Sequence, residues 1–144
     1  MDCLPDAAQL NIRILATDID PAILARADEA RFTAEELRPV PDRMRPWAFD
    51  PAVQGRHRIA QKVTRMVRFA ELNLMQDWPL RGPFDAIFCR NVAIYFDKPT
   101  QGRLWQRFAG LLAPGGLLFI GHSERLGGPA AAAFTSVGTT AYRR

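Results

Sequence analysis

The order of apolar and polar residues predicts short buried strands separated by helices. Residues 11–17 form a short apolar run with the composition of a buried strand. The run stops at an aspartate-rich turn, where Asp20 suits a helix N-cap and Pro21 suits the first helical position. The apolar spacing that follows predicts a helix from about Pro21 to Arg31. The chain is therefore expected to open with a strand that leads directly into a helix.

The stretch from residue 32 to residue 74 has a less regular pattern. A short helix is expected over residues 34–37, and the prolines at positions 39, 41, 46 and 51 predict turns and short helices after it. Residues 58–63 and 66–74 have the composition of strands.

The second half of the chain again alternates strands with helices. Such alternation predicts an α/β fold with a mainly parallel sheet. The expected elements are a turn at Gly82-Pro83, a buried strand over Phe84–Cys89, an amphipathic helix over residues 100–113 ended by Pro114-Gly115-Gly116, a strand over residues 117–120, and a terminal hairpin of residues 134–137 and 140–142.

Composition narrows the class of protein. A length of 144 residues suits one domain, and no run of 18 apolar residues indicates a membrane span. Cys3 and Cys89 have no metal-ligand spacing and form no disulfide scaffold, so a cytoplasmic protein without a metal is expected. The net charge of +4 comes mostly from scattered arginines. This pattern favours an acidic protein partner over a nucleic acid.

Polar residues follow several of the expected strands, where α/β sheets bind their ligands. Asp18 is placed to accept hydrogen bonds from a ribose diol, although it could instead cap the next helix together with Asp20. Asn73 could contact a ligand or only satisfy a turn. Asn91 and Tyr95 are four residues apart, so one helical turn would bring them to one side. The alternative is a loop in which Tyr95 packs its ring and exposes its hydroxyl.

A second kind of chemistry is considered at Gly121-His122-Ser123-Glu124. The residue types would suit a Ser-His-Glu hydrolase. His122 and Ser123 are sequence neighbours, however, and their side chains would diverge on a strand. The hydrolase interpretation is therefore disfavoured.

Several motifs occur together in an order that resembles a known family. The chain resembles the CheR-type protein-glutamate O-methyltransferases over about residues 11–143. The motifs are Ala-Thr-Asp-Ile-Asp-Pro at 16–21, Leu-Asn-Leu at 72–74, Phe-Asp-Ala-Ile-Phe-Cys-Arg-Asn-Val at 84–92, Ile-Tyr-Phe-Asp at 94–97 and Gly-His-Ser-Glu at 121–124.

The resemblance implies a fold, a reaction and roles for individual residues. It implies a Rossmann-like S-adenosylmethionine-dependent methyltransferase sheet with a C-terminal antiparallel hairpin. The methyl group would pass to glutamate carboxylates on the cytoplasmic helices of chemoreceptors, leaving S-adenosylhomocysteine. The implied roles are ribose binding by Asp18, adenine binding by Asn73 and Leu74, binding of the methionine part by Asn91 and Val92, and proximity to the transferred methyl group for Tyr95.

Against the pattern of the family that it resembles, the sequence shows one large difference. The family has an upstream helical domain and a central first strand with a glycine-rich loop, whereas residues 1–10 contain no glycine. An N-terminally truncated catalytic domain is therefore expected over residues 1–144, with a small β subdomain within residues 56–68. Two functions stay open: a methyltransferase that is incomplete in this chain, or a non-catalytic remnant that acts by binding. A homodimer or a domain swap could fill the gap.

Overall fold

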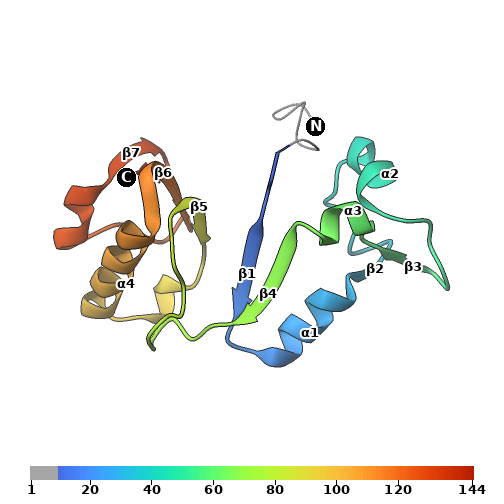
Figure 1. Ribbon diagram of the computed structural model, residues 1–144, viewed down its shortest axis with the longest axis horizontal. Helices are drawn as coiled ribbons and strands as arrows, with labels where there is room; N and C mark the ends of the chain where they lie inside the picture. The colour runs from blue at the N-terminus through green and yellow to red at the C-terminus, as the bar shows by residue number, and fades with distance from the viewer. Residues whose placement is uncertain (1–9) are drawn as a thin grey trace. The chain divides into compact units, whose positions relative to one another are not determined.

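The computed structural model describes residues 10–144, in which the chain divides into two compact units after Asp77. Each unit contains one pair of parallel strands and a helix that packs beside it (Figure 1). The expectations about Cys3 and the rest of residues 1–9 lie outside the described part. Within residues 10–144, no helix has both the length and the apolar character needed to cross a membrane.

The first unit is built on two parallel strands, β1 (Ile14–Asp18) and β4 (Val67–Glu71). Ile14 lies opposite Val67, and Asp18 lies opposite Glu71. Both predicted strands are confirmed with shorter bounds. Because the strands run in the same direction, the residues that follow Asp18 and Glu71 leave the sheet at one common edge.

The helix α1 (Pro21–Glu29) begins as the sequence predicts. The Asp20 side chain accepts a hydrogen bond of 2.8 Å from the Ala22 backbone N–H, and Pro21 occupies the first turn. The helix ends before the predicted Arg31 because Ala30 adopts a left-handed conformation with φ 53°. The cap and the proline therefore fix the direction in which the chain leaves β1.

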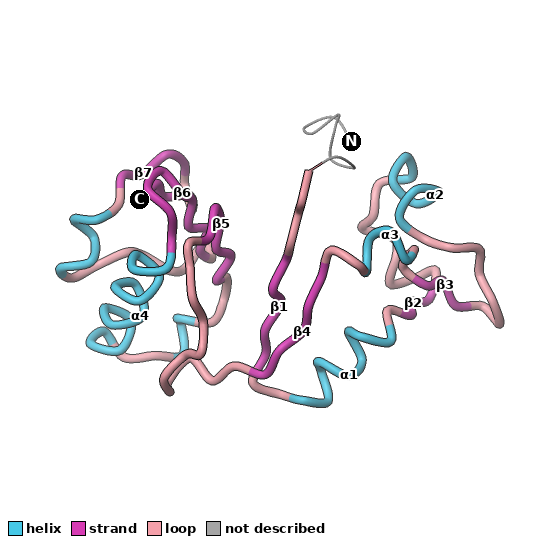
Figure 2. The backbone as a smooth tube through the Cα atoms, viewed as in Figure 1, coloured by secondary structure: helices cyan, strands magenta, loops and turns pink. Residues whose placement is uncertain are grey.

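The segment between α1 and β4 contains small elements (Figure 2). They are β2 (Arg31–Thr33), the 3-10 helix η1 (Asp42–Met44), α2 (Arg45–Ala48), β3 (Arg56–Arg58) and α3 (Gln61–Thr64). Strands β2 and β3 pair in antiparallel fashion. The predictions of short helices and turns around the prolines are thus confirmed.

Two predictions for this segment are wrong. Residues 34–37 form turns, because the Glu36 carboxylate binds back to the N–H and hydroxyl of Thr33 and closes a single turn. Residues 58–63 are mostly not a strand: pairing with β2 ends at Arg58, and residues 61–64 are helical. Both stretches are too short for periodicity to distinguish the alternatives.

The second unit contains one four-stranded sheet in the order β5-β6-β8-β7. Strand β5 (Phe84–Cys89) runs parallel to β6 (Leu112–Ile120), and α4 (Lys98–Leu111) connects them. The chain ends in the antiparallel pair β7 (Thr135–Gly138) and β8 (Ala141–Arg143), preceded by the 3-10 helix η3 (Pro129–Ala133). The predicted α/β fold with a terminal hairpin is confirmed.

The core of the second unit lies where α4 meets β6. Leu104, Trp105 and Phe108 of α4 are at most 5% exposed, and Leu118 and Ile120 of β6 are fully buried. The sequence predicted an amphipathic helix here, and these three buried residues of α4 form its apolar face. This packing fixes β6, and through its pairing it fixes β5 and the residues that follow Cys89.

The Pro114-Gly115-Gly116 segment was predicted to end the helix, but the helix ends before it. The helix ends at Leu111, three residues before the proline, and regular pairing of β6 with β5 resumes at Leu117. Between these points β6 is irregular, and the backbone of Gly115 and Gly116 exchanges hydrogen bonds with Arg144. The segment therefore joins the helix to the sheet and holds the C-terminal residue.

Replacement of Leu104 by alanine should lower the free energy of unfolding by about 2–5 kcal/mol, because the side chain is buried and leaves a cavity. Replacement of the nearby exposed Gln106 by alanine should change it by less than about 0.5 kcal/mol. Urea unfolding of both variants measures the difference. Equal stabilities would show that α4 does not pack as described.

Candidate cofactor-binding residues

Asp18 and Asp20 follow β1 and have different partners. Asp20 caps α1 through its side chain, as described above. The Asp18 carboxylate accepts one backbone hydrogen bond of 3.0 Å from Asp20, and it is half-buried. The carbonyl of Asp18 accepts a bond of 2.9 Å from the Leu72 N–H. Capping therefore falls to Asp20, and the Asp18 carboxylate retains lone pairs for a ligand.

Asn73 and Leu74 follow β4 at the same edge of this strand pair. The Asn73 carboxamide oxygen accepts a hydrogen bond of 2.9 Å from the Met75 N–H. This is the turn-forming role that the sequence left open for Asn73. This bond uses the oxygen and does not involve the amide NH₂ group. Both Asn73 and Leu74 are half-buried.

Asn91, Val92 and Tyr95 follow β5 in the second unit. Asn91 has a left-handed backbone with φ 60°, and the 3-10 helix η2 begins only at Ala93 and ends at Tyr95. Of the two alternatives that the sequence left open, the helical turn from Asn91 to Tyr95 does not form, because the left-handed Asn91 lies outside the helical segment. The Tyr95 side chain is 81% exposed, so its hydroxyl and ring face solvent.

Glu124 organises this second set of residues. It is 4% exposed, and one carboxylate oxygen accepts hydrogen bonds from the N–H groups of Val92 (2.9 Å) and Ala93 (2.7 Å). The other oxygen accepts a bond of 2.5 Å from the Gly121 N–H. The sequence placed Glu124 in a motif but gave it no such role. The signal that could have found it is a carboxylate in the turn after a buried strand, four residues beyond Ile120.

Gly121 lies against the same loop. A Cβ atom at this position would lie 2.5 Å from Asn91 Oδ1 and 2.9 Å from both Asn91 N and Glu124 Oε2. Only glycine allows β6 and the loop after β5 to approach this closely. Beside them, burial and the Glu124 charge raise the pKa of the Cys89 thiol to about 12, so it is neutral and inert at pH 7.

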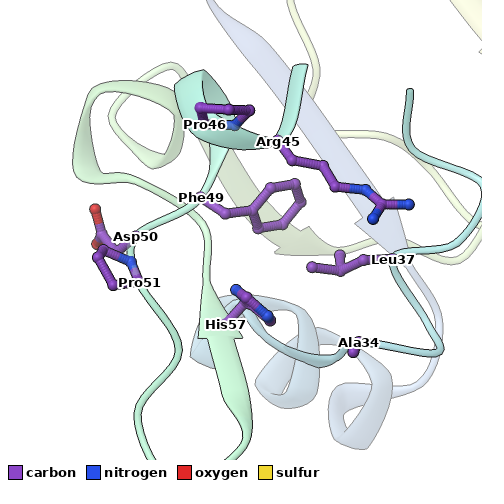
Figure 3. Close-up of a pocket in the computed structure, with 8 residues that line it drawn as sticks. All are labelled: Ala34, Leu37, Arg45, Pro46, Phe49, Asp50, Pro51 and His57. Carbon is purple, nitrogen blue, oxygen red and sulfur yellow. The ribbon is translucent and has the colours of Figure 1, made fainter. Parts of the chain in front are cut away.

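A separate cavity of about 410 Å³ lies in the first unit (Figure 3). Leu37, Phe49 and His57 direct their side chains toward it, and Arg45 lies at its rim. The Arg45 guanidinium binds the Val40 carbonyl and the Asp42 carboxylate. None of the predicted site residues lines this cavity.

Comparison with known proteins decides the family. Residues 1–143 match the family described as CheR methyltransferase, SAM binding domain. The chain belongs to the CheR methyltransferase family. The resemblance based on the sequence motifs is thus confirmed, and S-adenosylmethionine is the cofactor that this family domain binds.

Curated members of the CheR family are similar along most of this chain. A probable chemotaxis protein methyltransferase of Rhizobium etli is 49% identical over 99% of the chain. Chemotaxis protein methyltransferase 2 of Pseudomonas aeruginosa is 41% identical over 91%, and the chemotaxis protein methyltransferase of Klebsiella aerogenes is 48% identical over 78%. The chain spans 54%, 48% and 40% of these three relatives, respectively. It therefore covers about half their length.

Within this CheR-family chain, the structure brings the predicted site residues into two sets. The first is Asp18, Asn73 and Leu74 after β1 and β4, and the second is Asn91, Val92 and Tyr95 after β5. No group of three or more His, Cys, Asp or Glu side chains in residues 10–144 could hold a metal ion.

Replacement of Gly121 by alanine should lower the free energy of unfolding by about 1–3 kcal/mol, because the new methyl group would overlap the backbone of Asn91. Gly127 is the matched control, since a Cβ atom there meets nothing within 4 Å and its backbone needs no positive φ. Thermal and urea unfolding measure both variants. A Gly121 variant as stable as the Gly127 variant would contradict the close approach of the two loops.

Proposed function

We propose that this chain is the cofactor-binding part of a methyltransferase that transfers the methyl group of S-adenosylmethionine to glutamate side chains of chemoreceptors. The names of its relatives and the CheR family match support this activity. The observation that carries the proposal is the separation of roles between Asp20, which caps α1, and Asp18, whose carboxylate remains available.

The residues of the first set fit the nucleoside part of the cofactor. The Asp18 carboxylate is an acceptor at the end of a parallel strand, which suits the two hydroxyl groups of a ribose. Asn73 offers its amide NH₂ group to an adenine ring nitrogen, and Leu74 offers apolar surface to the ring. The half-burial of these side chains favours binding, because partial desolvation strengthens hydrogen bonds to a charged acceptor.

The residues of the second set fit the methionine part of the cofactor, provided that the Val92 backbone N–H takes no part in binding. The backbone N–H of Val92 is committed to Glu124 and is not available to a ligand. Asn91 would therefore bind through its carboxamide or its carbonyl, and Val92 through its side chain, which is 37% exposed. Tyr95 would place its hydroxyl near the transferred methyl group.

Methyl transfer requires the protein to align the donor with the substrate carboxylate more than to activate a bond. S-adenosylmethionine supplies a methyl group that a sulfonium already activates. The task of this chain is to hold the donor so that a substrate carboxylate oxygen can approach in line with the methyl group. A tyrosine hydroxyl suits that place, because it can donate a hydrogen bond to the substrate carboxylate.

The basic character of the chain suits such a substrate. A net charge of +4 favours encounter with acidic receptor helices, whose glutamates are the acceptors. Such helices lie in the cytoplasm, which is the location we assign to this protein. A chain that bound these helices without transferring methyl groups would share the charge but would not need the cofactor residues.

In the part of the chain that the structure describes, each strand pair that presents these residues has a free edge. Within residues 10–144, β1 pairs along one edge only, and so does β5. Ile14 on β1 is 50% exposed and Phe88 on β5 is 71% exposed. A further strand paired to each edge separately, for example one exchanged with a second copy in a homodimer, would satisfy the backbone groups of that edge and cover its exposed side chain.

Replacement of Asp18 by alanine should weaken binding of S-adenosylmethionine and S-adenosylhomocysteine by about tenfold or more, because two hydrogen bonds to a charged acceptor are lost. Isothermal titration of the protein at its natural length measures this. Asp28, an exposed carboxylate of α1, is the control for the loss of charge. Equal weakening by both variants would reject the ribose role. Absence of binding by the unmodified protein would reject the methyltransferase in favour of a binding module.

Replacement of Tyr95 by phenylalanine should reduce kcat for receptor methylation by about tenfold or more, because the hydroxyl acts at the reacting groups. Affinity for S-adenosylhomocysteine should stay unchanged. The side chain is exposed, so stability should change by less than about 0.5 kcal/mol. Methyl-ester formation on a purified receptor fragment reports the rate. An unchanged kcat would remove Tyr95 from the catalytic role.

A further inference from the structure

The buried carboxylate of Glu124 holds two segments that are far apart in the sequence. It belongs to the segment after β6, and its partners Val92 and Ala93 belong to the loop after β5, 32 and 31 residues away. Its third partner, Gly121, lies three residues before it. All three donors are backbone N–H groups, so the interaction constrains the course of the chain itself.

The loop that Glu124 holds carries the second set of proposed cofactor residues. Val92 is a direct partner of the carboxylate, and Asn91 precedes it with a left-handed backbone. The opposite side of the loop is also anchored, since the Gln101 side chain of α4 donates to the carbonyls of Ala93 and Phe96 at 2.8 and 3.0 Å. The N–H groups and the carbonyls of one short loop are thus held by two different elements.

The segment that carries Glu124 is itself fixed. The Glu124 N–H donates to the Gly121 carbonyl at 3.1 Å, which closes a tight turn. The Arg125 guanidinium donates to the carbonyls of His122 and Glu124 at 2.6 and 2.7 Å. The carboxylate is therefore presented from a rigid turn, and it acts as a fixed template for the loop opposite.

A glutamate carboxylate accepts these three N–H bonds better than a glutamine or an aspartate would. Its two oxygens accept three N–H bonds, and a negative charge strengthens each of them in a buried place. A glutamine has one oxygen, so its NH₂ group would face a backbone N–H and leave that donor unpaired. An aspartate is one methylene shorter and cannot reach the opposite loop from the same turn.

We infer that Glu124 is a positioning residue that sets the affinity for S-adenosylmethionine by fixing the loop of Asn91 and Val92. The inference rests on the proposed function, because the role of the loop in cofactor binding is part of it. Glu124 does not touch the cofactor in this account. It acts through the backbone that Asn91, Val92 and Tyr95 share.

The test compares Glu124→Gln with Ser123→Ala, an exposed neighbour in the same turn, in the protein at its natural length. Binding of S-adenosylhomocysteine is measured by calorimetry, and KM and kcat for S-adenosylmethionine are measured well below the melting temperature. Glu124→Gln should raise the dissociation constant and KM by about tenfold or more, with the KM for the receptor fragment unchanged. Ser123→Ala should change neither.

Each outcome bears on the inference. A variant that lost only stability would contain fewer active molecules with an unchanged KM, and this result would overturn the positioning role. If the unmodified protein bound no cofactor, the proposed function would fail and the inference would fall with it. If the unmodified protein bound and Glu124→Gln bound equally well, the inference alone would fail.

A second measurement uses only the unmodified protein and so does not depend on whether a variant folds. Amide hydrogen exchange of the unmodified protein should show the N–H groups of Val92, Ala93 and Gly121 protected, although Val92 and its neighbour Asn91 lie at the surface. Protection should match that of the β5 amides that donate to β6. Exchange of these three groups at unprotected rates would overturn the inference even if Glu124→Gln does not fold.

Discussion

The hydrogen bonds that the buried Glu124 carboxylate accepts from Val92, Ala93 and Gly121 fix the geometry on which the second unit's proposed site depends. Without them the N–H groups of the loop after β5 would lack a hydrogen-bond partner in the protein. Nothing would then hold Asn91 in its left-handed backbone conformation. The glycine at position 121 is a consequence of the same contact, because a side chain there would displace Asn91.

The first unit positions its proposed site residues through strand pairing and single hydrogen bonds, without a buried carboxylate among its described residues. Pairing of β1 with β4 brings the ends of both strands to one edge, and the Asp18 carbonyl accepts the Leu72 N–H where the pairing ends. Asp20 then caps α1, and Asn73 closes a turn with one of its two polar atoms. The atoms that remain, the Asp18 carboxylate and the Asn73 NH₂ group, are those that a nucleoside could use.

Local signals in the sequence predicted the local features of the fold. The strand Phe84–Cys89, the Asp20 cap and the terminal hairpin depend on neighbouring residues and were recovered. The helix over residues 34–37 and the strand over residues 58–63 were wrong, because runs this short carry too little periodicity. The conformation of Asn91 and the role of Glu124 were not predicted, because each depends on a contact across about 30 residues of sequence.

The residues that follow β1, β4 and β5 are proposed to bind S-adenosylmethionine. Titration of the isotope-labelled protein at its natural length with S-adenosylhomocysteine, followed by amide NMR, tests this proposal most directly. Saturable shifts are expected at Asp18, Asn73 and Asn91, with no change at Phe49 and His57 in the separate cavity. Shifts confined to that cavity, or no shifts at ligand concentrations of about 1 mM, would contradict it.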